Sequence, residues 1–96
     1  MHATIRSYTD PALADMLASN KDEIETMLGA VPGVQSYVLI RTPEGCSSVT
    51  VGDDETATSA SAKAAADFLR DHGATAAPSN VAGGEVLAHI GAVVPA

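Results

Sequence analysis

Six side chains that could bind or activate a small molecule fall at alternating positions of short apolar segments. They are two arginines, two tyrosines, a glutamate and a histidine: Arg6, Tyr8, Tyr37, Arg41, Glu85 and His89. Guanidinium groups can hold a carboxylate or a phenolate through forked hydrogen bonds. A histidine exchanges protons near neutral pH, so His89 could be a general base or a ligand anchor. Together these side chains predict a ligand-binding pocket with a few polar anchors.

Each of these residues also has an interpretation that needs no ligand. His89 could bond to Glu85 or Tyr37 in a dimer contact, and the two arginines could pair with Glu85 or with acids of a second subunit. The catalytic group of any reaction is therefore unknown, with His89 and Tyr37 as the candidates. Whether the protein is an enzyme stays open at this point.

Period-two alternation predicts the strands that carry these residues. Residues 2–8 alternate strictly, and residues 34–41 and about 46–52 flank the turn "TPEG", whose Pro and Gly suit the second and fourth turn positions. A two-residue loop would pair Arg41 with Cys46, whereas a three-residue loop with a bulge would shift the parity by one. We adopt the two-residue loop because it keeps one face apolar. Residues 84–91, "GEVLAHIG", predict a fourth strand after a turn or bulge at the glycine pair 83–84.

Two helices separate these strands. Asp10 and Pro11 are typical of a helix start, and Gly29 of a helix end, which predicts one long helix between them. Its apolar stripe has helical spacing and consists of Leu13, Met16, Leu17, Ile24, Met27 and Leu28. Asn20 falls within the stripe, and we expect its side chain to reach water.

A second helix is predicted before Gly73, with Asp54, Thr56 or Thr58 as its N-cap. Acidic residues gather at its start, where the helix dipole favours them. Near its end lies His72, which we expect to cap the helix because the dipole favours a cation there.

The element order is strand, helix, strand, strand, helix, strand, which is the split βαβ arrangement of the ferredoxin-like α+β fold, βαββαβ. Two helices would cover one face of an antiparallel four-stranded sheet and leave the other face open. We place the valine-rich set under the helices: Val34, Val38, Ile40, Val49 and Val51. The open face would then carry the six candidate residues together with Thr4, Leu39, Ser48, Thr50 and Leu87.

The stretch "PGVQSYVLIRT" after the first helix resembles a motif of the antibiotic biosynthesis monooxygenase-like group, a part of the dimeric α+β barrel superfamily. The matching positions are Pro32, Gly33, Ser36, Tyr37, Leu39 and Arg41. The resemblance implies a homodimer whose two sheets meet by their open faces and enclose a cavity. Relatives that degrade haem use a first-strand Asn, a Trp and a helix-end His. This chain has Phe68 and His72 four residues apart but neither the Asn nor any Trp, so we expect no haem and no other cofactor.

Composition limits the remaining possibilities. The 96 residues suit a single domain, residues 1–96, and the formal charge of −7 argues against nucleic acid and anionic membranes as partners. Cys46 is the only cysteine, which excludes an intrachain disulfide, and the three widely spaced histidines match no metal-binding motif. The first residues lack the pattern of a secretory signal, and the longest strongly apolar run is "YVLI", so we expect a cytoplasmic protein.

We therefore expect a small homodimeric α+β barrel that binds an organic molecule between its two sheets. One alternative is a cofactor-free monooxygenase-like enzyme, in which His89 or Tyr37 takes a proton from an electron-rich aromatic and Arg6 and Arg41 steady the anion. The other alternative is a dimerisation module without a ligand, whose open faces are consumed by the dimer contact.

Overall fold

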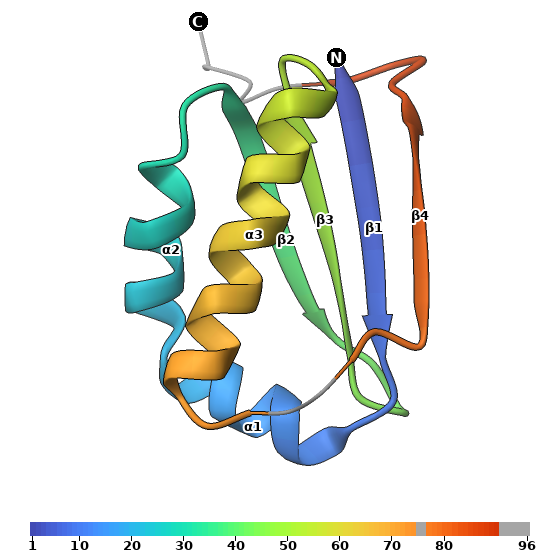
Figure 1. The fold of residues 1–96 in the computed structure, drawn as a ribbon. Helices are drawn as coiled ribbons and strands as arrows, with labels where there is room; N and C mark the ends of the chain where they lie inside the picture. Colours follow the sequence, from blue (N-terminus) through green and yellow to red (C-terminus); the bar gives the residue numbers. More distant parts are fainter. Residues whose placement is uncertain (75–76, 91–96) are drawn as a thin grey trace, which may run out of the picture.

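The computed structural model describes residues 1–74 and 77–90, and its fold is the predicted ferredoxin-like α+β fold (Figure 1). The strands are β1 (His2–Tyr8), β2 (Val34–Arg41), β3 (Cys46–Gly52) and β4 (Asn80–Glu85). They form one antiparallel sheet in the order β2-β3-β1-β4. The helices α1 (Pro11–Ser19), α2 (Lys21–Gly29) and α3 (Glu55–Asp71) lie against one face of this sheet.

The predicted register of the β2–β3 hairpin is confirmed. Arg41 pairs with Cys46 and Tyr37 with Thr50. Thr42 and Gly45 exchange two backbone hydrogen bonds of 3.0 and 3.2 Å, which leaves Pro43 and Glu44 as the two-residue loop. The apolar alternation therefore identified the correct pairing, as expected where a one-residue slip would reverse every side chain.

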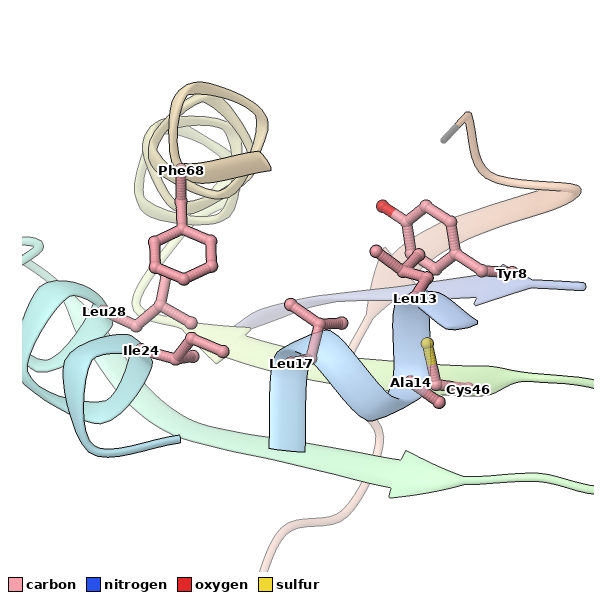
Figure 2. Close-up of a cluster of buried hydrophobic side chains, with 8 residues drawn as sticks. All are labelled: Tyr8, Leu13, Ala14, Leu17, Ile24, Leu28, Cys46 and Phe68. Atoms are coloured by element: carbon pink, nitrogen blue, oxygen red, sulfur yellow. The ribbon is translucent and has the colours of Figure 1, made fainter. Parts of the chain in front are cut away.

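The predicted assignment of the two sheet faces is wrong. Tyr8 and Cys46 are buried beneath the helices in a core cluster (Figure 2), and Tyr37 and Leu39 pack against the same cluster. The cluster consists of Tyr8, Leu13, Ala14, Leu17, Ile24, Leu28, Cys46 and Phe68. The two tyrosines of the candidate set thus fill the space under the helical layer, where the hydrophobic gain from burying them is greatest.

The opposite, open face carries the branched apolar residues instead. Ile5, Val38 and Ile40 remain 44%, 53% and 48% exposed, although Ile5 belongs to a strand with a neighbour on each side. Val38 pairs directly with Val49, so this apolar set is continuous across strands. The strand register shifts between Val34 and Ser36, so Val34 does not follow the alternation of faces seen along the rest of β2.

The first helical segment is broken at Asn20 into α1 and α2, where one continuous helix was predicted. The Asn20 side-chain amide donates a 2.8 Å hydrogen bond to the Met16 carbonyl, and its backbone N–H donates to the Leu17 carbonyl at 3.1 Å. An asparagine competes in this way with the helical backbone for hydrogen bonds. The expectation that Asn20 reaches water is therefore replaced by a role at the junction of two helices.

The ends of α3 agree with the sequence. Asp54 is the N-cap and accepts a hydrogen bond from the backbone N–H of Ala57, and Gly73 follows the helix with a φ of +72°. His72 is the C-cap: its Nδ1 lies 2.9 Å from the Phe68 carbonyl oxygen, and its ring stacks on the Phe68 ring. The expected capping role of His72 is thus confirmed.

The last strand lies earlier in the chain than predicted. β4 begins at Asn80 and ends at Glu85, so the two glycines at 83 and 84 are strand residues and His89 is outside the strand. Glu85 is paired with His2, the first residue of β1, which leaves no partner strand beyond it. A 2.9 Å bond from the Val86 N–H to the Met1 carbonyl ends the ladder. Residue 91 of the predicted strand lies outside the described residues.

Candidate functional site

A cavity of about 330 Å³ lies between α1, α2 and the helix-covered face of β2, and we call it the helix-side cavity. Its lining consists of Ala14, Ala18, Lys21, Ile24, Glu25, Tyr37, Leu39, Ile40, Arg41 and Cys46. The volume is at the lower end of the range of small-molecule sites, about 300–1,000 Å³.

Small side chains on α1 leave the room for this cavity. Ala14 and Ala18 are one helical turn apart, so they lie on the same side of α1 and both reach the cavity. On α2, Lys21 and Glu25 have the same four-residue spacing, which brings two charged groups to the same cavity. The break at Asn20 is what allows the two short helices to form adjacent walls.

Tyr37 supplies a phenol to the cavity wall. Burial raises the pKa of the Tyr37 phenol above its usual value, and the nearby Tyr8 and Cys46 add to the rise. The Ser48 hydroxyl and the Arg6 guanidinium act in the opposite direction without reversing it. Tyr37 is therefore neutral at physiological pH and offers an O–H donor rather than a proton acceptor.

Cys46 is buried at the inner end of the cavity and is 2% exposed. Burial raises the pKa of its thiol, and the Asp10 carboxylate contributes to the rise against the opposing charge of Arg41. A protonated, enclosed thiol is a poor nucleophile. Cys46 thus fits the role of an apolar wall residue.

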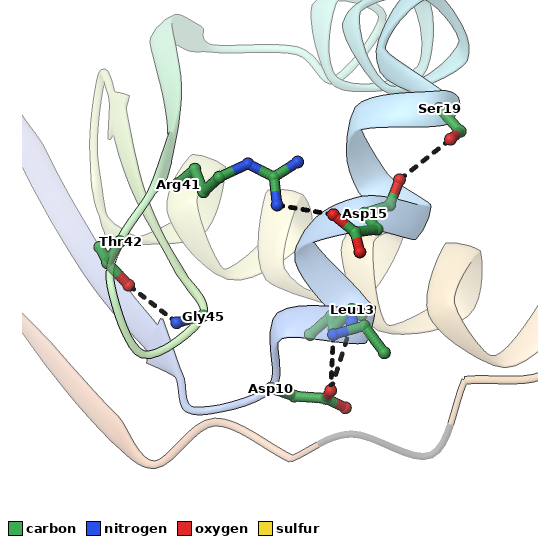
Figure 3. A network of polar contacts seen from close by, with 8 residues as sticks. Asp10, Leu13, Asp15, Ser19, Arg41, Thr42 and Gly45 are labelled. Carbon is green, nitrogen blue, oxygen red and sulfur yellow. Dashed lines mark hydrogen bonds and ion pairs between the residues drawn. The ribbon is translucent and has the colours of Figure 1, made fainter.

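Arg41 brings a charged group to the mouth of the cavity. One of its terminal nitrogens, Nη1, lies 2.7 Å from the Asp15 carboxylate of α1 (Figure 3). Both side chains are largely exposed, so the pair adds little to stability, at most about 1 kcal/mol. Its effect is geometric, because it holds the guanidinium over α1.

The structure brings together part of the predicted site. Tyr37 and Arg41 line the helix-side cavity. Tyr8 lies beside it, at a smaller gap of about 30 Å³ that it shares with Tyr37 and Phe68, and Arg6 is close enough to influence Tyr37 electrostatically.

Glu85 and His89 are not brought to this site. Glu85 lies on β4, at the sheet edge opposite β2, with β3 and β1 between them. Three strand spacings separate the two edges by roughly 14 Å. His89 follows the strand and is exposed. The residues that the sequence analysis missed are Lys21, Glu25 and the two alanines of α1, whose four-residue spacing was the available signal.

The buried phenol predicts a specific pH dependence of stability. Because the pKa of Tyr37 is higher in the folded than in the unfolded chain, the unfolded chain loses this proton first as the pH rises past about 10. The free energy of unfolding should then fall with increasing pH until the folded-state pKa is passed. Well below pH 10 this phenol should make the free energy of unfolding no more dependent on pH. Urea denaturation at pH 8 and pH 11 should show a larger loss for the native sequence than for Tyr37→Phe. An equal loss in both proteins would contradict a buried phenol.

His72 is held at the end of α3 by two contacts. Its Nδ1 lies 2.9 Å from the Phe68 carbonyl oxygen, and its Nε2 lies 3.4 Å from a Glu23 carboxylate oxygen. Within residues 1–74 and 77–90, no group of three or more His, Cys, Asp or Glu side chains could hold a metal ion. In the same ranges, no helix is long and apolar enough to cross a membrane.

The sheet order, the helix-covered face and the cavity define a ferredoxin-like α+β protein with the fold of the antibiotic biosynthesis monooxygenase-like group. No protein-family model matches the sequence, and no curated protein matches it significantly. Solved structures share its fold. HapK from Hahella chejuensis is 19% identical, with a TM-score of 0.69, and the match covers 98% of this chain and 100% of HapK.

Two further structures with this fold are named as monooxygenases. A putative antibiotic biosynthesis monooxygenase from Chloroflexus aurantiacus is 19% identical with a TM-score of 0.67, over 94% of this chain and 96% of its own. A monooxygenase from the gene ActVA-Orf6 of Streptomyces coelicolor, in complex with nanaomycin D, is 19% identical with a TM-score of 0.58, over 99% of this chain and 91% of its own. The resemblance expected from the sequence is thus confirmed for the fold.

Proposed function

We propose that this protein binds a small organic molecule in the helix-side cavity of each subunit of a homodimer. The observation that carries the proposal is the cavity itself: its inner wall is mostly apolar, the Tyr37 phenol is a neutral donor, and charged groups stand at its mouth. This combination is typical of small-molecule sites. The complex of the ActVA-Orf6 monooxygenase with nanaomycin D supports the proposal, since a protein with the same fold holds a small organic ligand.

Binding fits the site better than catalysis. The sequence analysis gave Tyr37 or His89 as the proton acceptor of a cofactor-free monooxygenase. A phenol whose pKa is raised by burial is rarely deprotonated near neutral pH and is therefore seldom available as a base. His89 lies beyond β4 and does not line the cavity. A monooxygenase-like reaction is therefore the second candidate, favoured by the names of two proteins with this fold. It would use Tyr37 as a hydrogen-bond donor.

The second copy would lie on the open face of the sheet. Ile5, Val38 and Ile40 form an exposed apolar surface there, and monomeric proteins rarely expose such contiguous surface. This arrangement differs from the expected one, because the two sheets would meet through apolar residues and each ligand site would lie inside one subunit.

We also propose that the chain binds no nucleic acid, given its charge of −7, and that it is cytoplasmic. The single, buried cysteine accords with a reducing compartment.

Blocking the cavity tests the binding function. Ala18 lines the cavity from an exposed position of α1, so Ala18→Leu should fill the mouth without disturbing the core. A panel of one- and two-ring aromatic compounds, screened by ligand-observed NMR, should give binders of the native sequence that Ala18→Leu loses. Ala66→Leu makes the same change at an exposed position of α3 and should keep them. Binders that persist in Ala18→Leu, or a panel without any binder, would leave the dimerisation module as the better interpretation.

A further inference from the structure

We infer that the helix-side cavity selects an apolar organic acid, whose hydrophobic body lies between Ala14, Ile24 and Leu39 and whose anionic group lies at the mouth between Lys21 and Arg41. The inference rests on the proposed function and adds the chemical class of the ligand. The geometry behind it is that two cationic side chains, from α2 and from the end of β2, line one apolar cavity.

Basic side chains are scarce in this chain, which makes their placement informative. Only five of the 96 residues are Lys or Arg, against twelve Asp or Glu. Lys63 and Arg70 are both paired with Asp67 on α3, at 3.1 and 3.0 Å. Two of the remaining three, Lys21 and Arg41, line the same cavity. A strongly acidic protein thus places two of its few cations where an incoming ligand would meet them.

Both cations have hydrogen-bond donors to spare. Asp15 engages one terminal nitrogen of Arg41, whereas a guanidinium carries five N–H donors, so the others can receive an anion. Lys21 forms no ion pair within 4.0 Å in the described part of the chain. A carboxylate between these groups would accept charge-assisted hydrogen bonds, which are about twice as strong as neutral ones.

Glu25 limits the selectivity and provides a test of it. Its carboxylate lines the same cavity one helical turn beyond Lys21 and would repel an anion. Glu25→Gln should therefore tighten the binding of an acid and leave the binding of a neutral analogue unchanged. A site for cations or for neutral ligands would show no such gain.

The decisive experiment compares 2-naphthoate with 2-naphthamide, two probes of nearly equal shape that differ in charge. Isothermal titration calorimetry on the full chain at pH 7.5 and low salt should give about tenfold tighter binding of the acid. Lys21→Gln and Arg41→Gln should each reduce that preference, and Glu25→Gln should increase it. Lys63→Gln removes a cation on α3 away from the cavity and serves as the matched control, with no change expected.

Two kinds of failure are distinguishable. Equal affinity for both probes, lost for both in Ala18→Leu, would overturn the selectivity for acids and keep the ligand cavity. Acid binding that is unchanged in both cation variants would overturn it as well. Absence of binding by either probe, or binding that survives Ala18→Leu, would overturn the inference and remove support from the proposed function itself.

Discussion

Gly45→Ala is expected to lower the free energy of unfolding by about 3 kcal/mol, a loss typical of severe overpacking. Gly45 closes the β2–β3 hairpin and is buried against the segment between β1 and α1. A β-carbon at this position would overlap the Tyr8 carbonyl oxygen and lie 2.6 Å from the Asp10 amide nitrogen. Because both are backbone atoms, neither can rotate away. Urea denaturation followed by far-UV circular dichroism, at one fixed protein concentration, measures the loss.

Gly29→Ala is the matched control for this substitution. Gly29 is the last residue of α2, and an added β-carbon there meets nothing within 4 Å. We expect no loss of stability, or a gain of up to about 1 kcal/mol, since alanine has less conformational freedom to lose. A Gly45→Ala protein within about 0.5 kcal/mol of the native sequence would mean that the hairpin tip does not pack on the Tyr8–Asp10 segment.

The sequence predicted the first three strands and the hairpin register because alternation is a local property. It could not assign the faces, because both sets of alternate residues contain large apolar side chains. Val38 and Ile40 are as hydrophobic as Tyr37 and Leu39, and only the packing of the helices decides which pair lies beneath them. When both faces of a sheet are apolar, the sequence alone does not reveal which face the helices cover.

The candidate site was predictable only where it lies on a strand. Tyr37 and Arg41 share a face of β2, and the prediction placed them together for that reason. The opposite wall depends on the break at Asn20, which forms when a side-chain amide competes with the helical backbone. His89 was misplaced because residues 84–91 alternate like a strand, although β1 begins at His2 and offers no partner beyond Glu85.

Ile5→Asp is expected to convert the proposed homodimer into monomers and to raise the dimer dissociation constant on the order of 100-fold or more. Ile5 is on β1, inside the sheet, between Val49 of β3 and Ala82 of β4, and its side chain is 44% exposed on the open face. In a two-fold symmetric interface one substitution changes both subunits, so two carboxylates would be desolvated at once. Analytical ultracentrifugation of the native and variant proteins over a range of micromolar concentrations measures the effect.

Val81→Asp separates loss of the interface from a general effect of a charge in the sheet. Val81 is 51% exposed on β4 and is paired with Arg6, which places it on the helix-covered side of the sheet but beyond the helices. An aspartate at this position should disfavour the strand about as much as an aspartate at Ile5, and it should leave the dimer intact. A native protein that sediments as a monomer would exclude the second copy, whereas a dimer that tolerates Ile5→Asp would have its interface on another surface. Loss of the dimer in Ile5→Asp alone would show why the branched apolar residues of this sheet point away from its helices.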